Sequence, residues 1–269
     1  MLDLINAILL GIIEGITEFL PISSTGHLII ANRFFPLPPS VEVTFDIFIQ
    51  LGAILAIVWL YRAKILDLLR RLPSDRGAQR FGLALLIAFL PAAILGILIH
   101  GAIEKYLFGP VPVAFAMVLG GILILMIDRN DRKGNTHATE EVTTRQSALI
   151  GAAQALSLFP GVSRSAATIL GGLVTGLDRR TAVEFSFFLA IPTLGSATLY
   201  ALAKSASSLQ SSDWILLAAG FISTFITALI IVRWFLRYVS TNTLAPFGIY
   251  RIVVGFLVLT LYLTGLLRR

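Results

Sequence analysis

Apolar positions along this chain gather into runs, and the length of each run limits what it can do in a membrane. A helix needs about 20 mainly apolar residues to cross the hydrocarbon core of a bilayer. Six runs reach roughly that length, near 43–61, 81–101, 110–127, 182–203, 213–232 and 249–267. The pattern therefore predicts an all-α polytopic membrane protein with six transmembrane helices.

Two pairs of shorter apolar runs are broken by Pro or Gly. They lie at 4–20 with 22–34, and at 147–159 with 162–177. A chain that turns within lipid leaves backbone groups unpaired unless protein or a wet cavity surrounds it. Short interrupted segments at corresponding places in two halves mark the binding site of inverted-repeat membrane proteins. We therefore expect two re-entrant helical hairpins that enter from opposite faces and meet near the middle.

Residues of the two halves match when the sequence is shifted by 140 positions. The matched pairs are Gly11 with Gly151, Glu14 with Gln154, Phe19 with Phe159, Ser23 with Ser163, Phe45 with Phe185 and Phe48 with Phe188. Each half then holds one hairpin and three spans, and an odd number of spans inverts the second half. We predict one integral membrane domain of two inverted-topology repeats, about 4–128 and 146–267, joined by a cytoplasmic polar loop at 128–146.

Lysine and arginine in the loops set the expected orientation. The loop 62–80 carries six of them, whereas its counterpart 203–213 carries one, Lys204. Cytoplasmic loops are enriched in Lys and Arg, so 62–80 is expected inside the cell and both termini outside.

Composition agrees with a membrane protein and excludes other classes. The chain of 269 residues is 57% hydrophobic with a mean hydropathy of +0.87, and only 13% of its residues are charged, against about 25% in soluble domains. The net charge of +6 comes from the loops between spans, so we expect no nucleic-acid binding. The absence of Cys excludes disulfides and thiolate metal sites.

The first hairpin carries two carboxylates in an otherwise apolar run. Glu14 and Glu18 are four residues apart, so on a helix both project from one face. An intramembrane carboxylate costs about 2.5–3.5 kcal/mol on insertion scales, which favours a function over a plain surface position. Neighbouring carboxylates repel unless a cation lies between them. We interpret the pair as ligands for Mg²⁺ or Ca²⁺, which prefer hard oxygen atoms, or as an acid and a base.

A break and a group of hydroxyls follow the carboxylates. Pro21 ends the helix, and Ser23, Ser24 and Thr25 precede Gly26 and His27. Ordinary helix capping explains any one of the hydroxyls. Together at a helix start, where free N–H groups and the positive end of the helix dipole lie, they indicate an anion site. His27 is either a satisfied core residue or, beside Ser24, a proton carrier.

The second hairpin supplies a cation. Arg164 is the only charged residue between Gln146 and Leu177, and it occupies the position that matches Ser24. Its planar guanidinium suits phosphate oxygens; the alternative is a structural salt bridge to Glu14 or Glu18. Ser163 and Ser165 flank it. A divalent cation, an Arg clamp, backbone donors and a candidate nucleophile together suit phosphoryl chemistry on a substrate delivered through the lipid.

Two motifs carry a resemblance to a known family. E-x-x-x-E followed by P-x-S-S-T-G-H begins at Glu14, and P-G-x-S-R-S begins at Pro160, with Thr168 also matching. In both motifs, and over essentially its whole length, the chain resembles the bacterial undecaprenyl-diphosphate phosphatases of the bacitracin-resistance type. One departure is Ala166, where many members have Gly.

This resemblance implies an activity and a setting. The expected reaction hydrolyses the C55 isoprenyl diphosphate to the monophosphate and inorganic phosphate, which recycles the lipid carrier of peptidoglycan and supports cell-wall biogenesis, cell shape and resistance to the antibiotic bacitracin. It implies a divalent-cation-dependent enzyme of the bacterial plasma membrane, open to the periplasmic or outer side and often a homodimer. The alternative is a transporter or flippase of a phosphorylated isoprenoid lipid, which has the same architecture.

Roles for the individual residues complete the hypothesis. We expect Glu14 and Glu18 to hold the metal–diphosphate, His27 to move a proton, and Arg164 to take part in catalysis. Ser24 is either the nucleophile or a phosphate ligand beside an attacking water. The expected phosphate ligands are Ser23, Thr25, Ser163, Arg164, Ser165 and Thr168.

Overall fold

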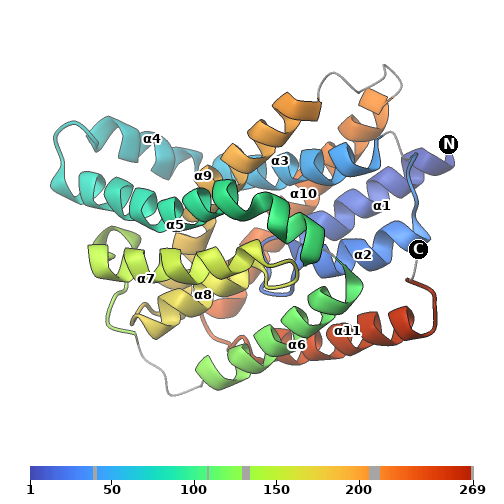
Figure 1. Cartoon of the computed structure of the whole chain (residues 1–269). Coiled ribbons are helices and arrows are strands. Elements are labelled where there is room, and N and C mark those ends of the chain that lie inside the picture. Colours follow the sequence, from blue (N-terminus) through green and yellow to red (C-terminus); the bar gives the residue numbers. More distant parts are fainter. Residues whose placement is uncertain (39–40, 108, 129–133, 206–212, 268–269) are drawn as a thin grey trace.

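The computed structural model describes residues 1–38, 41–107, 109–128, 134–205 and 213–267, and the regular elements in these ranges are all helices (Figure 1). Parts of the expected loops 128–146 and 203–213, and the side chain of Lys204, lie outside the described residues. The all-α expectation is confirmed.

Helices occupy all six expected spans. They are α3 (Glu42–Leu60), α5 (Arg76–Tyr106), α6 (Pro110–Ile127), α9 (Arg179–Ser205), α10 (Asp213–Val239) and α11 (Ala245–Leu263). Five of them are long and apolar enough to cross a membrane, and α3 makes a sixth together with the helix that follows it. These helices confirm a multi-pass membrane protein.

A helix that the apolar pattern did not predict lies in the basic loop. Residues Arg62–Arg71 form α4, which bends by 69° from α3. Arg71 stabilises it locally, because its guanidinium pairs with Asp67 at 2.8 Å and with Asp75 at 3.1 Å, one turn away on either side. In Figure 1, α4 lies at the opposite side of the molecule from the N-terminus.

Both predicted hairpins are present. The first consists of α1 (Leu2–Thr17) and α2 (Ser24–Phe34). The second follows a short 3₁₀ turn, η1 (Thr139–Glu141), and consists of α7 (Thr144–Ala155), η2 (Leu156–Leu158) and α8 (Arg164–Val174). Their re-entry into a bilayer and their inversion stay predictions.

The two hairpin turns have the same backbone at matched positions. Ser23 has φ 74° and Ser163 has φ 71°, and they are the non-glycine residues with positive φ in the described chain. Each is the N-cap of the next helix: Ser23 Oγ accepts from Gly26 N–H, and Ser163 Oγ accepts from Ala166 N–H. A strained conformation of this kind persists only where the surroundings over-determine it.

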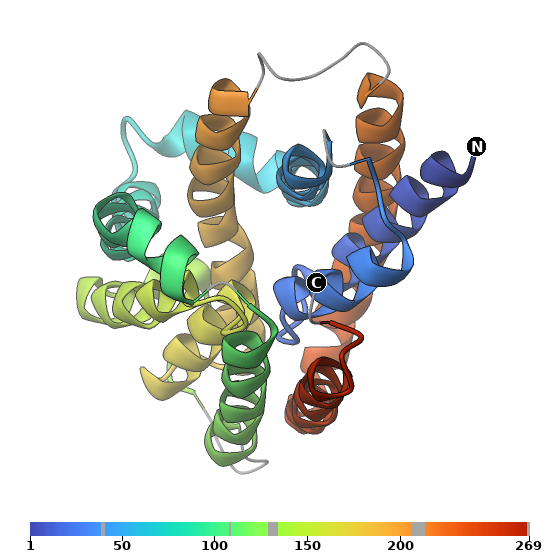
Figure 2. The same cartoon turned by 45° about the vertical axis from the view of Figure 1, so that its right-hand side comes forward.

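The hairpins pack across the two halves of the chain. The first helix of each hairpin lies on a long helix of the other half, α1 on α10 and α7 on α5, while α6 pairs with α11. Figure 2 shows the two hairpins approaching each other with their turns near the centre of the molecule. Phe19 anchors this junction, because its buried ring meets the edge of Phe187 at 5.4 Å between centroids.

Candidate active site

One carboxylate joins the two hairpins. Glu18, the C-cap residue of α1, accepts a hydrogen bond from Ser24 Oγ at its Oε2 atom (2.6 Å). Its other oxygen, Oε1, forms an ion pair with Arg164 Nη2 at 3.2 Å. Glu18 and Arg164 are both buried, so little water screens the pair. The structure therefore contains the salt bridge between Arg164 and Glu18 that was one of the sequence-based alternatives, and it adds Ser24 to it.

Glu14 lies one turn before Glu18 and has no such partners. It is fully buried, and neither of its carboxylate oxygens finds a hydrogen-bond partner among the residues that the structure describes. Because a buried charge is costly unless it is paired or bound to a metal, Glu14 is a candidate metal ligand.

Arg164 is held from two sides. Beyond Glu18, its Nη1 atom donates to the carbonyl of Ser186 at 3.0 Å and to the Ser186 hydroxyl at 3.3 Å. Its guanidinium lies over the ring of Phe19, 5.6 Å from the centroid. The Nε atom is buried and has no acceptor within the described part of the chain. One donor of the fork therefore remains for another oxygen.

The two ring nitrogens of His27 have partners other than Ser24. Its Nδ1 atom lies 2.7 Å from the carbonyl of Ser23, which only accepts, so Nδ1 carries the proton in this arrangement. In the neutral ring, Nε2 then accepts from the hydroxyl of Tyr250, 2.8 Å away. The base that contacts Ser24 is therefore Glu18.

The hydroxyls of the second hairpin serve contacts within the protein. Ser165 Oγ donates to the carbonyl of Leu20 at 2.8 Å, which ties the two turns together. Thr168 Oγ1 lies 2.6 Å from Ser186 Oγ, the same residue that holds Arg164. Ser163 caps α8. The proposed contacts of these three residues with phosphate stay predictions.

Helix N-termini converge at the junction. The first turns of α2 and α8 begin at Ser24 and Arg164, on opposite sides of Glu18. Ser23 caps α2 with its side-chain oxygen. Thr25 lies half-buried in the first turn of the same helix. Two helix starts facing one point form an anion-binding environment.

Three contributors were missed from the sequence. Tyr250 partners His27, Ser186 supports Arg164, and Arg251 contacts both hairpin turns. The first two carry no distinguishing signal, because single hydroxyls are common in such helices. Arg251 did have one: it is an arginine inside the apolar run 249–267, where a charge is costly.

The carboxylates fit a divalent cation only in part. No group of three or more His, Asp or Glu side chains is arranged to hold a metal within the described residues. Glu14 and Glu18 offer carboxylate oxygens, and those of Glu14 are unpartnered. This fits an ion such as Mg²⁺, which is usually bound through one or two carboxylates together with substrate phosphates and water.

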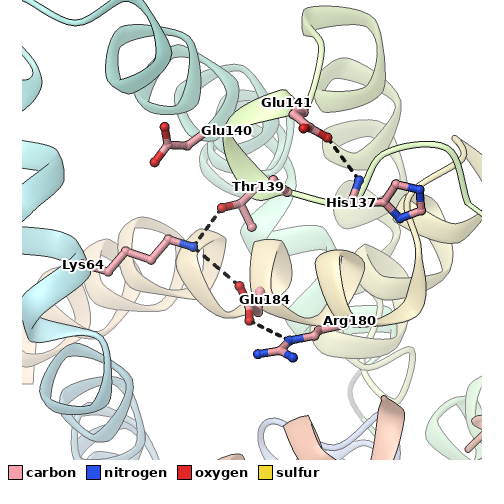
Figure 3. Close-up of a pocket in the computed structure, with 8 residues that line it drawn as sticks. Lys64, His137, Thr139, Glu140, Glu141, Arg180 and Glu184 are labelled. Carbon is pink, nitrogen blue, oxygen red and sulfur yellow. Dashed lines mark hydrogen bonds and ion pairs between the residues drawn. The ribbon is translucent and has the colours of Figure 1, made fainter. Parts of the chain in front are cut away.

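A cavity lined mainly by charged residues lies elsewhere in the molecule. It measures about 630 Å³ and is lined by charged residues of α4, η1 and α9 (Figure 3). Lys64 pairs with Glu184 at 3.5 Å, and Arg180 pairs with the same carboxylate at 3.3 Å. These charges satisfy one another, and the cavity holds none of the predicted site residues. We therefore place the active site at the hairpin turns, where buried groups lack partners.

Comparison with known proteins identifies the family of the chain. A family model described as bacitracin resistance protein BacA matches residues 7–257. The undecaprenyl-diphosphatase of Nitrosomonas europaea is 48% identical over 265 residues, which cover 98% of this chain and 97% of that protein.

Two further relatives carry the same name. The undecaprenyl-diphosphatase of Caldanaerobacter subterraneus is 49% identical over 259 residues, 96% of each chain. That of Janthinobacterium is 48% identical over 260 residues, 95% of this chain and 94% of its own. A match of this length and identity leaves the membership plain: the chain belongs to the bacitracin resistance protein BacA family.

Proposed function

We infer that the protein is an integral membrane undecaprenyl-diphosphatase, which converts undecaprenyl diphosphate to undecaprenyl phosphate and inorganic phosphate. The relatives that match nearly the whole chain carry this name. The observation that carries the inference is Glu18, which contacts Ser24 on one side and Arg164 on the other. A nucleophile, its base and a phosphate clamp meet there in a buried site.

We propose that Glu18 is the general base. The oxygen that attacks the terminal phosphorus belongs to Ser24 or to a water in its place, and its proton passes to Glu18 Oε2. The bond from phosphorus to the bridging oxygen breaks, and that oxygen leaves on undecaprenyl phosphate. If Ser24 attacks, a water then releases phosphate from phosphoserine. Arg164 stabilises the charge that develops on the phosphate oxygens, and the N–H groups at the starts of α2 and α8 add to it.

We propose that the carboxylates of Glu14 and Glu18 would hold a divalent cation, Mg²⁺ or Ca²⁺. Such an ion supplies charge neutralisation for phosphoryl transfer. Support comes from the unpartnered oxygens of Glu14, whose burial without a partner is costly. His27, with Tyr250 on its Nε2 atom, is proposed to carry a proton between the site and water.

The setting remains part of the proposal. We place the protein in the bacterial plasma membrane, with α4 on the cytoplasmic side and the active site open to the outer side. The positive charge of α4 and of its flanking residues supports this orientation. A homodimer is the expected assembly, and the two inverted repeats at 4–128 and 146–267 are the expected organisation.

Phosphate release by the purified protein tests the function. The assay uses undecaprenyl diphosphate in detergent, where no membrane is crossed, with Mg²⁺, with Ca²⁺ and with a chelator. Cation-dependent release that is lost in folded Arg164→Ala protein supports the phosphatase. A well-folded wild type that releases nothing with any cation contradicts it and favours the transporter or flippase. Rapid acid quenching separates the two nucleophiles, because only attack by Ser24 leaves phosphoserine.

A further inference from the structure

Arg251 of α11 is a fully buried arginine whose partners are backbone carbonyls. Nη1 donates to Pro21 at 3.3 Å, and Nη2 donates to Gly161 and Val162, each at 3.0 Å, and to Ala116 at 3.2 Å. Nε donates to Met117 at 3.3 Å. No carboxylate pairs with Arg251 in the described part of the chain, so five neutral oxygens surround its charge.

The distribution of these carbonyls is more informative than their number. Pro21 belongs to the turn of the first hairpin, whereas Gly161 and Val162 belong to the turn of the second. The two turns are 140 positions apart in the sequence, and one side chain contacts both. Ala116 and Met117 fix the guanidinium itself to α6.

The turn carbonyls also determine where the neighbouring N–H groups point. A trans peptide is planar, so its C=O and N–H bonds point in opposite directions. The carbonyl of Val162 points at Arg251, and the N–H of Ser163 therefore points away from it. Ser163 is the N-cap of α8, and Arg164 follows directly. Arg251 thus binds the turn on the side opposite to the N–H of Ser163, and α8 starts on the side of Glu18.

An arginine in this place is costly, because a charge within an apolar span loses its water. The fold also makes room for it: a Cβ on Gly120 of α6 would collide with Arg251 Nη2. A long apolar side chain could fill the same volume without a buried charge. The five donors of a guanidinium in a fixed plane explain the choice, because they bind the two turns simultaneously at defined angles.

We propose that Arg251 is a positioning residue for the phosphatase: it sets the two hairpin turns relative to each other, and through them the alignment of Ser24 and Glu18 with Arg164. The inference rests on the proposed function. It predicts an effect on turnover, because a misplacement of about 1 Å can cost about 10²-fold in rate. We expect the affinity for substrate to change less, because the partners of Arg251 are backbone carbonyls and not the side chains proposed to bind phosphate.

The test compares Arg251→Lys and Arg251→Met with wild type in steady-state phosphate release from undecaprenyl diphosphate. We expect kcat to fall by about 10²-fold in both variants, with a change in KM below about threefold. The kcat of Arg251→Met should be no higher than that of Arg251→Lys, because neither side chain contacts both turns. The pH profile of kcat should keep its shape, since Arg251 moves no proton. Arg179→Lys is the matched control. Arg179 is the first residue of α9, and it pairs with the buried carboxylate of Asp128 at 2.6 Å, away from the hairpin turns.

A second variant keeps the proposal testable if both substitutions prevent folding. Gly120→Ala retains the Arg251 side chain, but the added Cβ would displace its Nη2 atom. This variant should show a smaller loss of kcat, again with KM preserved. An active wild type together with folded Arg251 variants that keep kcat within threefold overturns the proposal. An equal loss of kcat in Arg179→Lys also overturns it, since the effect would then be general destabilisation. An inactive wild type instead rejects the phosphatase itself.

Discussion

The two hairpins share a scaffold but treat the same position differently. Glu14 of the first is buried with both carboxylate oxygens unpartnered among the described residues. Gln154, its match in the second, is equally buried, but its amide donates to the carbonyl of Ala88 at 3.1 Å and its oxygen accepts from Thr193 at 3.1 Å. At this matched position the second hairpin has an amide whose hydrogen bonds are satisfied, and the first has a carboxylate without a hydrogen-bond partner among the described residues.

The scaffold itself corresponds in detail. Near the start of each hairpin an amide ties back to a carbonyl just after its second helix: Asn6 to Pro36 at 2.9 Å, and Gln146 to Thr175 at 3.1 Å. Asn6 and Gln146 are 140 positions apart, as are the cap residues Ser23 and Ser163. Both hairpins therefore have the same turn geometry and a similar tie between their ends, while the two carboxylates lie in the first hairpin and the arginine lies in the second.

Removing the charge that joins the hairpins should have the largest effect. Glu18→Gln keeps the shape but deprives Ser24 of its base and Arg164 of its counter-charge. We expect kcat for phosphate release to fall by about 10³-fold, within the range of general base catalysis. Glu184→Gln is the control, because it neutralises a paired carboxylate outside the site. Glu18→Gln protein that is folded and retains a tenth of wild-type kcat would remove Glu18 from the mechanism.

Exchanging the matched residues tests the comparison directly. Glu14→Gln should raise the Mg²⁺ concentration for half-maximal activity by about 10-fold or more, since one of two hard-oxygen ligands is lost, and it should leave the thermal stability of the metal-free protein unchanged or higher. Gln154→Glu should instead lower the stability and leave the cation dependence nearly unchanged. It places a carboxylate against the Ala88 carbonyl and should cost roughly 1–3 kcal/mol of stability with little change in cation dependence. Equal cation effects in both variants would contradict the division of roles.

Tyr250 separates proton transfer from binding. Tyr250→Phe removes the hydroxyl on His27 Nε2 but keeps the ring, whose centroid lies 5.5 Å from that of the imidazole. We expect kcat to fall by about 3–10-fold, which is less than the roughly 10²–10⁴-fold contribution of a direct acid–base catalyst, with KM unchanged and with an altered pH profile. The matched comparison is Ser186→Ala, which loosens Arg164 and should raise KM without altering that profile. An unchanged pH profile in Tyr250→Phe would count against a proton path through His27.

The helices were predictable because each is encoded locally. Length and apolar pattern place the six spans, and Pro21 and Pro160-Gly161 place the hairpin turns. α4 was missed, since its Arg, Lys and Asp residues make it too polar for an apolar run. At the site, the E-x-x-x-E spacing and the lone Arg164 identify the chemistry. The partner of His27 could not be foreseen, because Tyr250 is 223 positions away and only packing brings α11 to α2.

Substitution of the capping serine should change the stability alike in the two hairpin turns if the turns are equivalent. Ser23 and Ser163 pair a positive φ with a capping hydroxyl. Ser→Ala removes the cap and keeps the strain, whereas Ser→Gly relieves the strain, worth about 1–2 kcal/mol. At both positions Gly should therefore be more stable than Ala by roughly 1 kcal/mol, seen as a difference of about 2–4 °C in melting temperature. A difference of opposite sign at the two positions would show that only one turn is held in this conformation by its surroundings.

The smallest effect concerns the exit of the second hairpin, where Asp178 stands at the position that matches Pro38 in the first. Partial burial favours the neutral form of Asp178, but hydrogen bonds from Thr181 N–H at 2.7 Å and His137 Nδ1 at 2.8 Å outweigh it, so its pKa lies below its ordinary value. A lowered pKa in the folded state gives stability above the unfolded value of about 3.9, and that stability is lost as the pH falls through the folded pKa. Asp178→Asn keeps an oxygen for Thr181 but loses the charge. Its melting temperature should therefore lie below that of wild type at pH 6 and approach it below about pH 3. A gap that persists at low pH would assign the role of Asp178 to its shape instead of its charge, and the exits of the two hairpins would then differ in packing alone.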